Sequence, residues 1–195
     1  MTSTSTTAKH VKTSDSTPLL SVRDLRVHFP LKRGFLVQRE VARVRAVDGV
    51  SFDIYPGETL GLVGESGSGK TTAAKAVIQL NNPGGGSVKF EGQELVGLST
   101  KAMRPVRRKM GMVFQDPYGS LNPRLRAGDI VGEPLKVHGL ADTRDEYRQQ
   151  VASLLTTVGL SPAMAERYPN EFSGGQRQRL GIARAIAAKP SLLIL

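Results

Sequence analysis

The sequence predicts an α/β fold, because short apolar stretches typical of strands alternate along the chain with helix patterns. Two observations carry this prediction. A glycine-rich loop stands between the apolar run Thr59–Val63 and a helix pattern at Lys70–Leu80, and the apolar run Ser191–Leu195 follows a second helix pattern. Strands that alternate with helices in this way form a mostly parallel sheet. The 195 residues suffice for one or two domains with a hydrophobic core.

The first ordered elements are predicted to be strands. Residues 1–18 are rich in Ser and Thr, contain almost no large apolar residues and lack the apolar middle of a secretory signal, so we expect a disordered tail there. From Leu19 on, apolar and polar residues alternate in two stretches, as in half-buried strands. The apolar residues of these stretches are Leu25, Val27 and Phe29, then Val50, Phe52 and Ile54. The basic residues 32–45 between them are expected to form an exposed connection.

Two helices are predicted in the second half of the chain. The first is expected at Arg144–Val158, where apolar residues share one face and Gly159 is a stop signal. The second should begin after Ser173, a favourable N-cap, and end near Ala188. Two further short strands are expected, at Val88–Phe90 and Met110–Phe114.

The chain is strongly basic, with a formal net charge of +10. Such a charge favours anionic partners such as nucleotides, nucleic acids or anionic lipids, and a solvated basic face explains it equally well. Aromatic residues make up only 5% and do not interleave with the basic clusters at 23–45 and 101–109, which disfavours a protein that stacks on exposed bases. No apolar run approaches the roughly 20 residues that cross a bilayer. Cysteine is absent, which excludes disulfides and thiolate metal sites.

A phosphate-binding loop is predicted between the apolar run and the helix. The residues Gly64-Glu65-Ser66-Gly67-Ser68-Gly69-Lys70-Thr71 match the pattern of Gly, four residues and Gly-Lys-Ser/Thr. Glycines let successive N–H groups surround the triphosphate oxygens, and the following helix adds its N-terminal amides and dipole. Lys70 supplies a mobile positive charge, the Thr71 hydroxyl is the expected Mg²⁺ ligand, and Thr72 completes the nucleotide-binding set. A chance glycine-rich turn does not account for this position between strand and helix.

Two later motifs indicate a family. Phe172-Ser173-Gly174-Gly175-Gln176-Arg177-Gln178-Arg179 resembles the signature motif of ABC ATPases, usually written LSGGQ and here beginning with Phe. Phe114-Gln115-Asp116-Pro117 resembles their Q-loop, and all of these motifs occur in the family's order. A plain helix start would explain the four residues Ser173–Gln176 alone, but not the three motifs together. The resemblance covers Leu19–Leu195.

The resemblance can be narrowed to the ATP-binding subunits of oligopeptide and dipeptide importers, and nickel importers share much of it. It is carried by the extended Q-loop Phe114–Arg124, with Val27–Pro30, Gly61–Gly67 and Tyr168–Phe172. The chain departs from the family pattern at Asn170, where His is expected, and at Ala73-Ala74, where Leu-Gly is more usual. Neither departure affects a phosphate-binding atom.

The resemblance implies a P-loop NTPase core of ABC type over residues 19–115 and 173–195, an antiparallel β portion near the N-terminus, and a helical subdomain over residues 116–172. It implies ATP and Mg²⁺ as cofactors. Lys70 and Gln115 are then the catalytic residues, with Gln115 on Mg²⁺ and the attacking water. The signature residues face ATP held by a second subunit in a head-to-tail dimer; they are Ser173, Gly174, Gly175 and Gln176. Phe29 is the candidate for stacking on adenine, although a core residue on an alternating strand fits nearly as well.

Other residues contribute less to these expectations. His10, His28 and His138 form no cluster and are assigned no site.

The family's Walker B carboxylates, its D-loop and its switch histidine should follow the strand pattern Ser191–Leu195. We therefore expect the sequence to be a fragment of a longer ATPase, incomplete at the C-terminus, that binds ATP weakly or not at all and does not hydrolyse it alone at a useful rate.

The function predicted from the resemblance is ATP-driven peptide import, with this chain as a peripheral motor on the cytoplasmic face of the plasma membrane. The expected partners are permease subunits in the membrane, a second ATP-binding subunit, and a separate binding protein that delivers the peptide; no nucleic acid is expected. Two alternatives stay open. One is a soluble ABC-type ATPase that acts on DNA or ribosomes, which the basic charge favours and the extended Q-loop disfavours. The other is a remnant that binds nucleotide without turnover.

Overall fold

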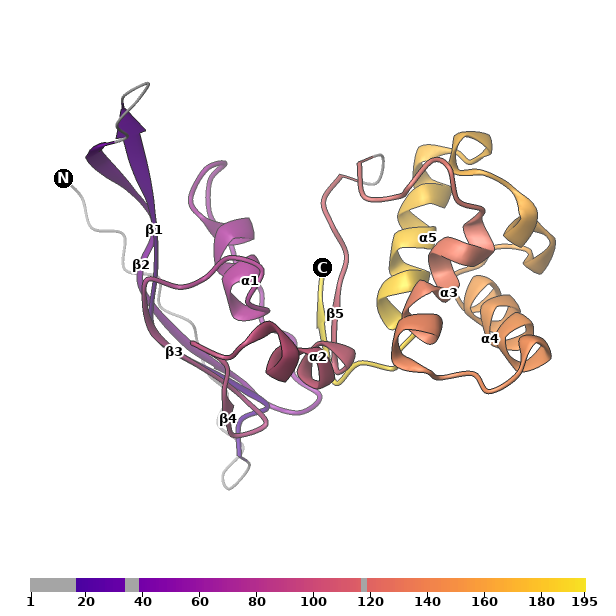
Figure 1. Ribbon diagram of the computed structural model, residues 1–195, viewed down its shortest axis with the longest axis horizontal. Helices are drawn as coiled ribbons and strands as arrows, with labels where there is room; N and C mark the ends of the chain where they lie inside the picture. The colour runs from indigo at the N-terminus through magenta and orange to yellow at the C-terminus, as the bar shows by residue number, and fades with distance from the viewer. Residues whose placement is uncertain (1–16, 34–38, 117–118) are drawn as a thin grey trace. The chain divides into compact units, whose positions relative to one another are not determined.

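The chain divides into two units, residues 1–100 and residues 101–195. They are seen in a computed structural model of the protein, which describes residues 17–33, 39–116 and 119–195 (Figure 1). Among these residues, no helix combines the length and the apolar character that crossing a bilayer requires. The predicted assignment of residues 19–115 and 173–195 to one core, with 116–172 as a helical subdomain, stays a prediction.

The first unit is built on a four-stranded antiparallel sheet with the strand order β2-β1-β3-β4. The strands are β1 (Leu20–Arg33), β2 (Arg39–Ile54), β3 (Gly85–Phe90) and β4 (Gln93–Glu94). Helix α1 (Lys70–Val77) packs on β1 and β2, and buries Ala73, Ala76 and Val77. Leu25 and Val27 of β1 are also buried, as their alternation predicts, whereas Phe29, the third apolar residue of that alternation, is exposed. The predicted antiparallel portion near the N-terminus is therefore confirmed.

The prediction of a connection at residues 32–45 is wrong for the described residues 32–33 and 39–45, which belong to strands, although residues 42–45 are exposed as predicted. Residues 34–38 lie outside the described residues. Strands β1 and β2 are paired on either side of this gap, with Phe29 opposite Val44 and Pro30 opposite Arg43. Figure 1 shows the two strands continuing as a ribbon beyond β3, which pairs only with the Leu20–Arg26 part of β1. A two-stranded ribbon has solvent on both faces, so its residues need no apolar alternation. The sequence pattern therefore did not indicate strands here, because these residues are mostly charged.

The expected strand at Thr59–Val63 is also absent from the described residues. The segment is an irregular, extended stretch, and the Val63 side chain is 87% exposed. A strand needs a hydrogen-bonded neighbour, and no described strand pairs with this segment. Parallel pairing occurs only between β5 and β6, so the expectation of a mostly parallel sheet is wrong for the part of the chain that the structure describes.

The second unit joins a short parallel strand pair to a bundle of helices. Its strands are β5 (Met110–Met112) and β6 (Leu192–Ile194), with Met110 opposite Leu192. Its α-helices are α2 (Thr100–Arg108), α3 (Ala127–His138), α4 (Arg144–Thr157) and α5 (Gly174–Ile186), with 3-10 helices η1 (Pro162–Glu166) and η2 (Pro169–Glu171). One apolar core joins α3, α4 and α5, and it includes Ile130, Leu135, Leu155, Phe172 and Leu180.

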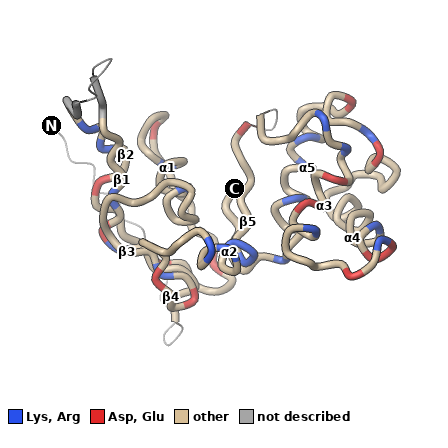
Figure 2. Tube along the Cα trace, viewed as in Figure 1, with Lys and Arg blue, Asp and Glu red and all other residues tan. Residues whose placement is uncertain are grey.

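Helices α4 and α5 confirm the sequence predictions, whereas α2 and α3 were not predicted. The buried residues of α3 do follow helical spacing: they are Ala127, Ile130, Val131, Gly132 and Leu135. Pro134 inside α3 and Pro105 inside α2 obscured the pattern, because proline usually ends a helix. Figure 2 shows the Lys and Arg residues that gather on α2, at the basic cluster predicted for residues 101–109.

Candidate functional site

The glycine-rich loop of the first unit leads directly into α1, whose first residue is Lys70. Gly69 is the N-cap of α1 with φ of 91°, and the Ser68 N–H donates to the Glu65 carbonyl at 3.2 Å. The loop is largely exposed. The first N–H groups of a helix have no intrahelical acceptor, so the start of α1 offers donors and a positive dipole end to an anion.

Close approach to backbone requires glycine at one position of the loop. A Cβ at Gly69 would lie 2.1 Å from the Ala46 carbonyl oxygen of β2, and the positive φ independently favours glycine. A Cβ at Gly64 would lie 2.7 Å from the Ser68 Oγ, a hydroxyl that can rotate away. The last glycine of the motif therefore has a direct steric cause, because the end of the loop packs against the backbone of β2.

The Lys70 ammonium is folded back over the loop. Its Nζ donates to the Gly64 and Glu65 carbonyl oxygens, each at 2.6 Å, and to the Ser68 Oγ at 3.3 Å. A carbonyl oxygen is neutral, whereas a phosphate oxygen is charged and binds an ammonium more strongly. Lys70 can therefore exchange these acceptors for phosphate oxygens without leaving the loop.

The residues present fit a magnesium nucleotide. Magnesium is commonly held by one or two protein ligands together with substrate phosphates and water. The Thr71 hydroxyl, exposed at the first turn of α1, supplies one such ligand, and Thr72 beside it is half-buried. Among the described residues, no cluster of three or more His, Asp or Glu residues forms a separate metal site. This donor set suits a metal that arrives with its nucleotide.

Phe29 lies on β1 with 43% of its side chain exposed, so it is not a core residue. Strand register places it close to the loop. Gly69 approaches Ala46 and Val47 of β2, while Phe29 pairs with Val44 on the same strand. Val44 and Ala46 are about 7 Å apart along β2, and Phe29 lies one strand further away. This register places the exposed ring of Phe29 on the part of the sheet that the loop approaches.

Gln115 belongs to the second unit, just beyond the end of β5. Val113 extends the strand pairing, since its N–H donates to the Ile194 carbonyl at 2.9 Å, and Gln115 follows in an exposed position. Ligands of open α/β sheets bind at the carboxyl ends of parallel strands. Pro117 and Tyr118 of the predicted Q-loop lie outside the described residues.

The signature residues form the N-terminus of α5. Ser173 is the N-cap: its Oγ accepts from the Gln176 N–H at 3.3 Å, and the Gln176 Oε1 accepts from the Ser173 N–H at 2.9 Å. Gly174 and Gly175 are exposed, and a Cβ at Gly175 would meet no atom within 4 Å. The helix start is therefore open to solvent and offers amide donors to an anion.

The site residues thus fall into two groups. The loop residues Gly64–Thr72 and Phe29 lie together in the first unit, and Gln115 and Ser173–Gln176 lie in the second. Sequence reasoning missed Arg184, whose half-buried guanidinium on α5 donates to the Ser120 carbonyl at 2.8 Å. Desolvation lowers the pKa of Arg184. This hydrogen bond ties Ser120 to α5. In the sequence, the one sign of such a role was an arginine placed among the apolar residues of the second half of α5.

Replacing Ser173 with alanine is expected to destabilise the second unit by about 1 kcal/mol, because the N-cap acceptor of α5 is lost. Urea unfolding of the chain measures the change. Ser161→Ala is the matched control: Ser161 is the N-cap of η1, and its side chain makes no capping hydrogen bond. Equal losses in the two variants would contradict the capping role of Ser173.

Comparisons with known proteins show which family the chain resembles. The family model described as "ABC transporter" matches residues 47–195. The oligopeptide transport ATP-binding protein AppF of Bacillus subtilis (strain 168) is 50% identical over 177 residues, which cover 90% of this chain and 53% of the relative. The glutathione import ATP-binding protein GsiA of Escherichia coli (strain K12) is 51% identical over 180 residues, 92% of this chain and 29% of the relative.

A solved structure is similar to the whole fold. The dimeric bacterial ABC transporter cassette MJ0796 superposes with a TM-score of 0.78 and 30% sequence identity, over 89% of this chain and 72% of that chain. The same cassette is also known bound to ADP and Pi after hydrolysis. The chain spans about half the length of the oligopeptide transport relatives that it matches.

Proposed function

The chain belongs to the ABC transporter family, and from this premise we propose that it is the ATP-binding motor of an importer for peptides. The family comprises ATPases, so nucleotide binding, typically with Mg²⁺, follows from membership. One observation carries the proposal for this chain: the loop Gly64–Thr71 folds as a phosphate cradle, with Lys70 over its carbonyls and α1 beginning at its end. The peptide substrate is proposed from the similarity to oligopeptide transport proteins.

The loop binds the β- and γ-phosphates of ATP through its N–H groups and the start of α1. Lys70 leaves the Gly64 and Glu65 carbonyls and pairs with the outer phosphates, while Thr71 holds the metal and Phe29 stacks on the adenine. Thr71 and Gln115 would hold Mg²⁺, and the ion would supply charge neutralisation for the transferred phosphoryl group. Gln115 would also orient the attacking water. Catalysis by these residues is positioning and charge stabilisation.

A second ATP-binding subunit is part of the proposal. The phosphate-binding loop Gly64–Thr71 lies in the first unit of the chain. In the second unit, the exposed start of α5 at Ser173–Gln176 offers backbone N–H donors to an anion. In a head-to-tail dimer these residues contact the γ-phosphate bound by the partner's loop. The cassette MJ0796, which shares the fold, is itself dimeric.

The permease is the remaining proposed partner. The motor acts from the cytoplasmic face of the membrane, passes force through the surface around Gln115–Leu121 to integral-membrane permease subunits, and takes no nucleic acid. Within this surface, the Ser120 carbonyl accepts a hydrogen bond from the Arg184 guanidinium of α5 at 2.8 Å, which offers a link between the surface and α5. The peptide reaches the permease from a separate binding protein.

Cross-linking tests the permease assignment. The chain has no cysteine, so Ser120→Cys introduces a single thiol beside Gln115. In membranes of cells that co-produce an oligopeptide permease, this thiol is expected to trap a permease subunit. Gln93→Cys, on the exposed strand β4 of the first unit, is the control and should trap much less. Recovery of ribosomes or DNA instead of a permease would favour a soluble ABC ATPase and contradict the proposal.

A further inference from the structure

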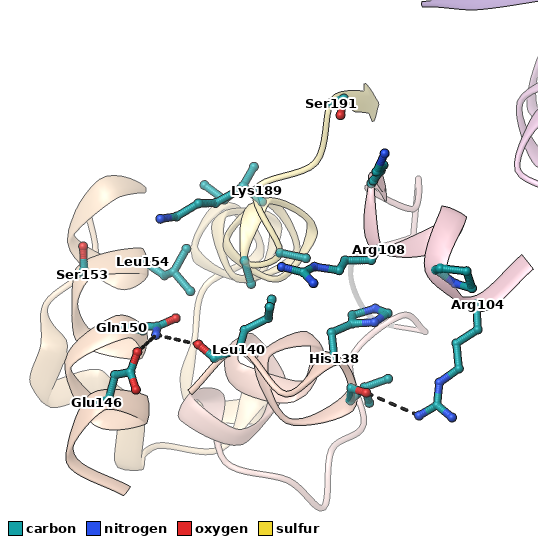
Figure 3. Close-up of a pocket in the computed structure, with 16 residues that line it drawn as sticks. Arg104, Arg108, His138, Leu140, Glu146, Gln150, Ser153, Leu154, Lys189 and Ser191 are labelled. Atoms are coloured by element: carbon teal, nitrogen blue, oxygen red, sulfur yellow. Dashed lines mark hydrogen bonds between the residues drawn. The ribbon is translucent and has the colours of Figure 1, made fainter. Parts of the chain in front are cut away.

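A cavity of about 1200 Å³ lies within the second unit. Figure 3 shows its walls, which come from α2, the end of α3, α4 and the end of α5. Its volume exceeds the usual range of small-molecule sites, about 300–1,000 Å³, so it has room for such a ligand with water. None of its lining residues belongs to the candidate nucleotide site, so the cavity needs an explanation of its own.

The cavity is lined by more cations than anions. Its basic side chains are Arg104, Arg108, Lys109 and Lys189, with the imidazole of His138. Its single carboxylate, Glu146, is already committed: one oxygen accepts from the Asp142 N–H at 2.9 Å and the other from the Gln150 amide at 2.9 Å. Neither Arg108 nor Lys189 forms an ion pair with a carboxylate of the residues that the structure describes.

The pKa of the His138 imidazole responds to the positive charges around the cavity. Burial lowers its pKa, and the charges of Arg108 and Arg104 lower it further. On its other side, His138 also lines a smaller cavity with Arg107, Glu133 and Arg184. An anion bound beside Arg108 would offset the field of the arginines and raise the pKa of His138.

The backbone at Lys189 is held in an unfavourable conformation. Its φ is +51°, in the left-handed region that glycine adopts freely and other residues adopt at a cost. The turn is fixed by the Lys189 N–H, which donates to the Ile186 carbonyl at 2.9 Å. Such conformations gather at functional sites. A lysine stands where glycine would be the stable choice, and its side chain lines the cavity.

One side of the cavity is apolar. Leu140 and Leu154 lie across from α2 in Figure 3, and Ile186 and Ala187 add further apolar lining. A ligand that fits must therefore combine negative charge with an apolar body. A phosphate monoester carries up to two negative charges and suits the planar guanidinium fork of an arginine, so it balances more of these cations than a single carboxylate does.

We propose that this cavity binds a small organic phosphate, with the phosphate group between Arg108 and Lys189 and the apolar part on Leu140 and Leu154. The site is separate from the ATP loop and does not depend on the proposed import function.

Phenyl phosphate is the probe. It is titrated into the full chain carrying Lys70→Ala, which removes the main phosphate ligand of the loop, and the His138 ring signals are followed by NMR. Saturable binding with a rise in the pKa of His138 is expected. Arg108→Ala and Lys189→Gly should each weaken binding at least tenfold. Arg148→Ala, an exposed cation of α4 outside the cavity, is the matched control and should change the affinity less than twofold.

Lys189→Gly separates binding from folding, because glycine adopts φ of +51° without strain. Its unfolding midpoint should be equal to or above that of the parent chain while its affinity falls. The proposal is overturned if His138 shows no saturable response, if Arg148→Ala weakens binding as much as Arg108→Ala, or if inorganic phosphate binds as tightly as phenyl phosphate.

Discussion

Replacing Gly69 with alanine is expected to abolish nucleotide binding and to destabilise the first unit. The residue has φ of 91°, and a Cβ there would lie 2.1 Å from the Ala46 carbonyl oxygen. The left-handed conformation alone costs a non-glycine residue about 1–2 kcal/mol. The backbone clash adds to this cost, since neither the loop nor β2 can yield without moving the start of α1. Urea unfolding measures the stability loss, and titration with MgATP measures binding.

Gly67→Ala is the matched control for Gly69→Ala. Gly67 also has a positive φ, 82°, but a Cβ there would meet no atom within 4 Å. Only the conformational cost of about 1–2 kcal/mol is expected. If the two substitutions destabilise the chain equally, the close approach between the loop and β2 has no role in holding the cradle.

Lys70→Ala is expected to lower the affinity for MgATP by about 1.5–3 kcal/mol, which is roughly 10- to 150-fold. The ammonium that now bonds to the Gly64 and Glu65 carbonyls would no longer be available to the outer phosphates. Isothermal titration of both chains at one salt concentration measures the difference, because screening changes ionic contacts.

Lys75→Ala provides the comparison. Lys75 stands in the last turn of the same helix, so it carries the same charge without a place in the loop. Its removal should change ATP affinity by less than about threefold, the effect of one distant and screened charge. A loss similar to that of Lys70→Ala would mean that the net charge of the unit, rather than the loop, attracts the nucleotide.

The parts of the fold that were predicted correctly are those set by local chemistry. Ser173 caps α5 and the apolar face of α4 buries Val151 and Leu155, because capping and helical periodicity act over a few residues. The last glycine of the loop, Gly69, likewise reflects a conformation with positive φ at the start of α1. Each of these features is decided by residues that are neighbours in sequence.

The parts that were missed depend on partners distant in sequence. Strand pairing at residues 39–45 needs β1 opposite, and charged side chains hide it. The apolar run Thr59–Val63 has the composition of a buried strand but no described neighbour to pair with. Arg184 gains its role only because α5 packs behind Ser120. Composition does not show which distant segment supplies the other half of such contacts.

The most direct measurement is an NMR titration of the ¹⁵N-labelled chain with MgATP, followed at the backbone amides. The account predicts saturable shifts that are largest at Gly64–Thr72, where the loop N–H groups and the start of α1 meet the phosphates, with a smaller change at Phe29. It predicts that Lys70→Ala moves the same amides at higher ligand concentrations. Shifts that saturate elsewhere and leave Gly64–Thr72 unchanged, or no shifts at millimolar MgATP in a folded chain, would contradict it.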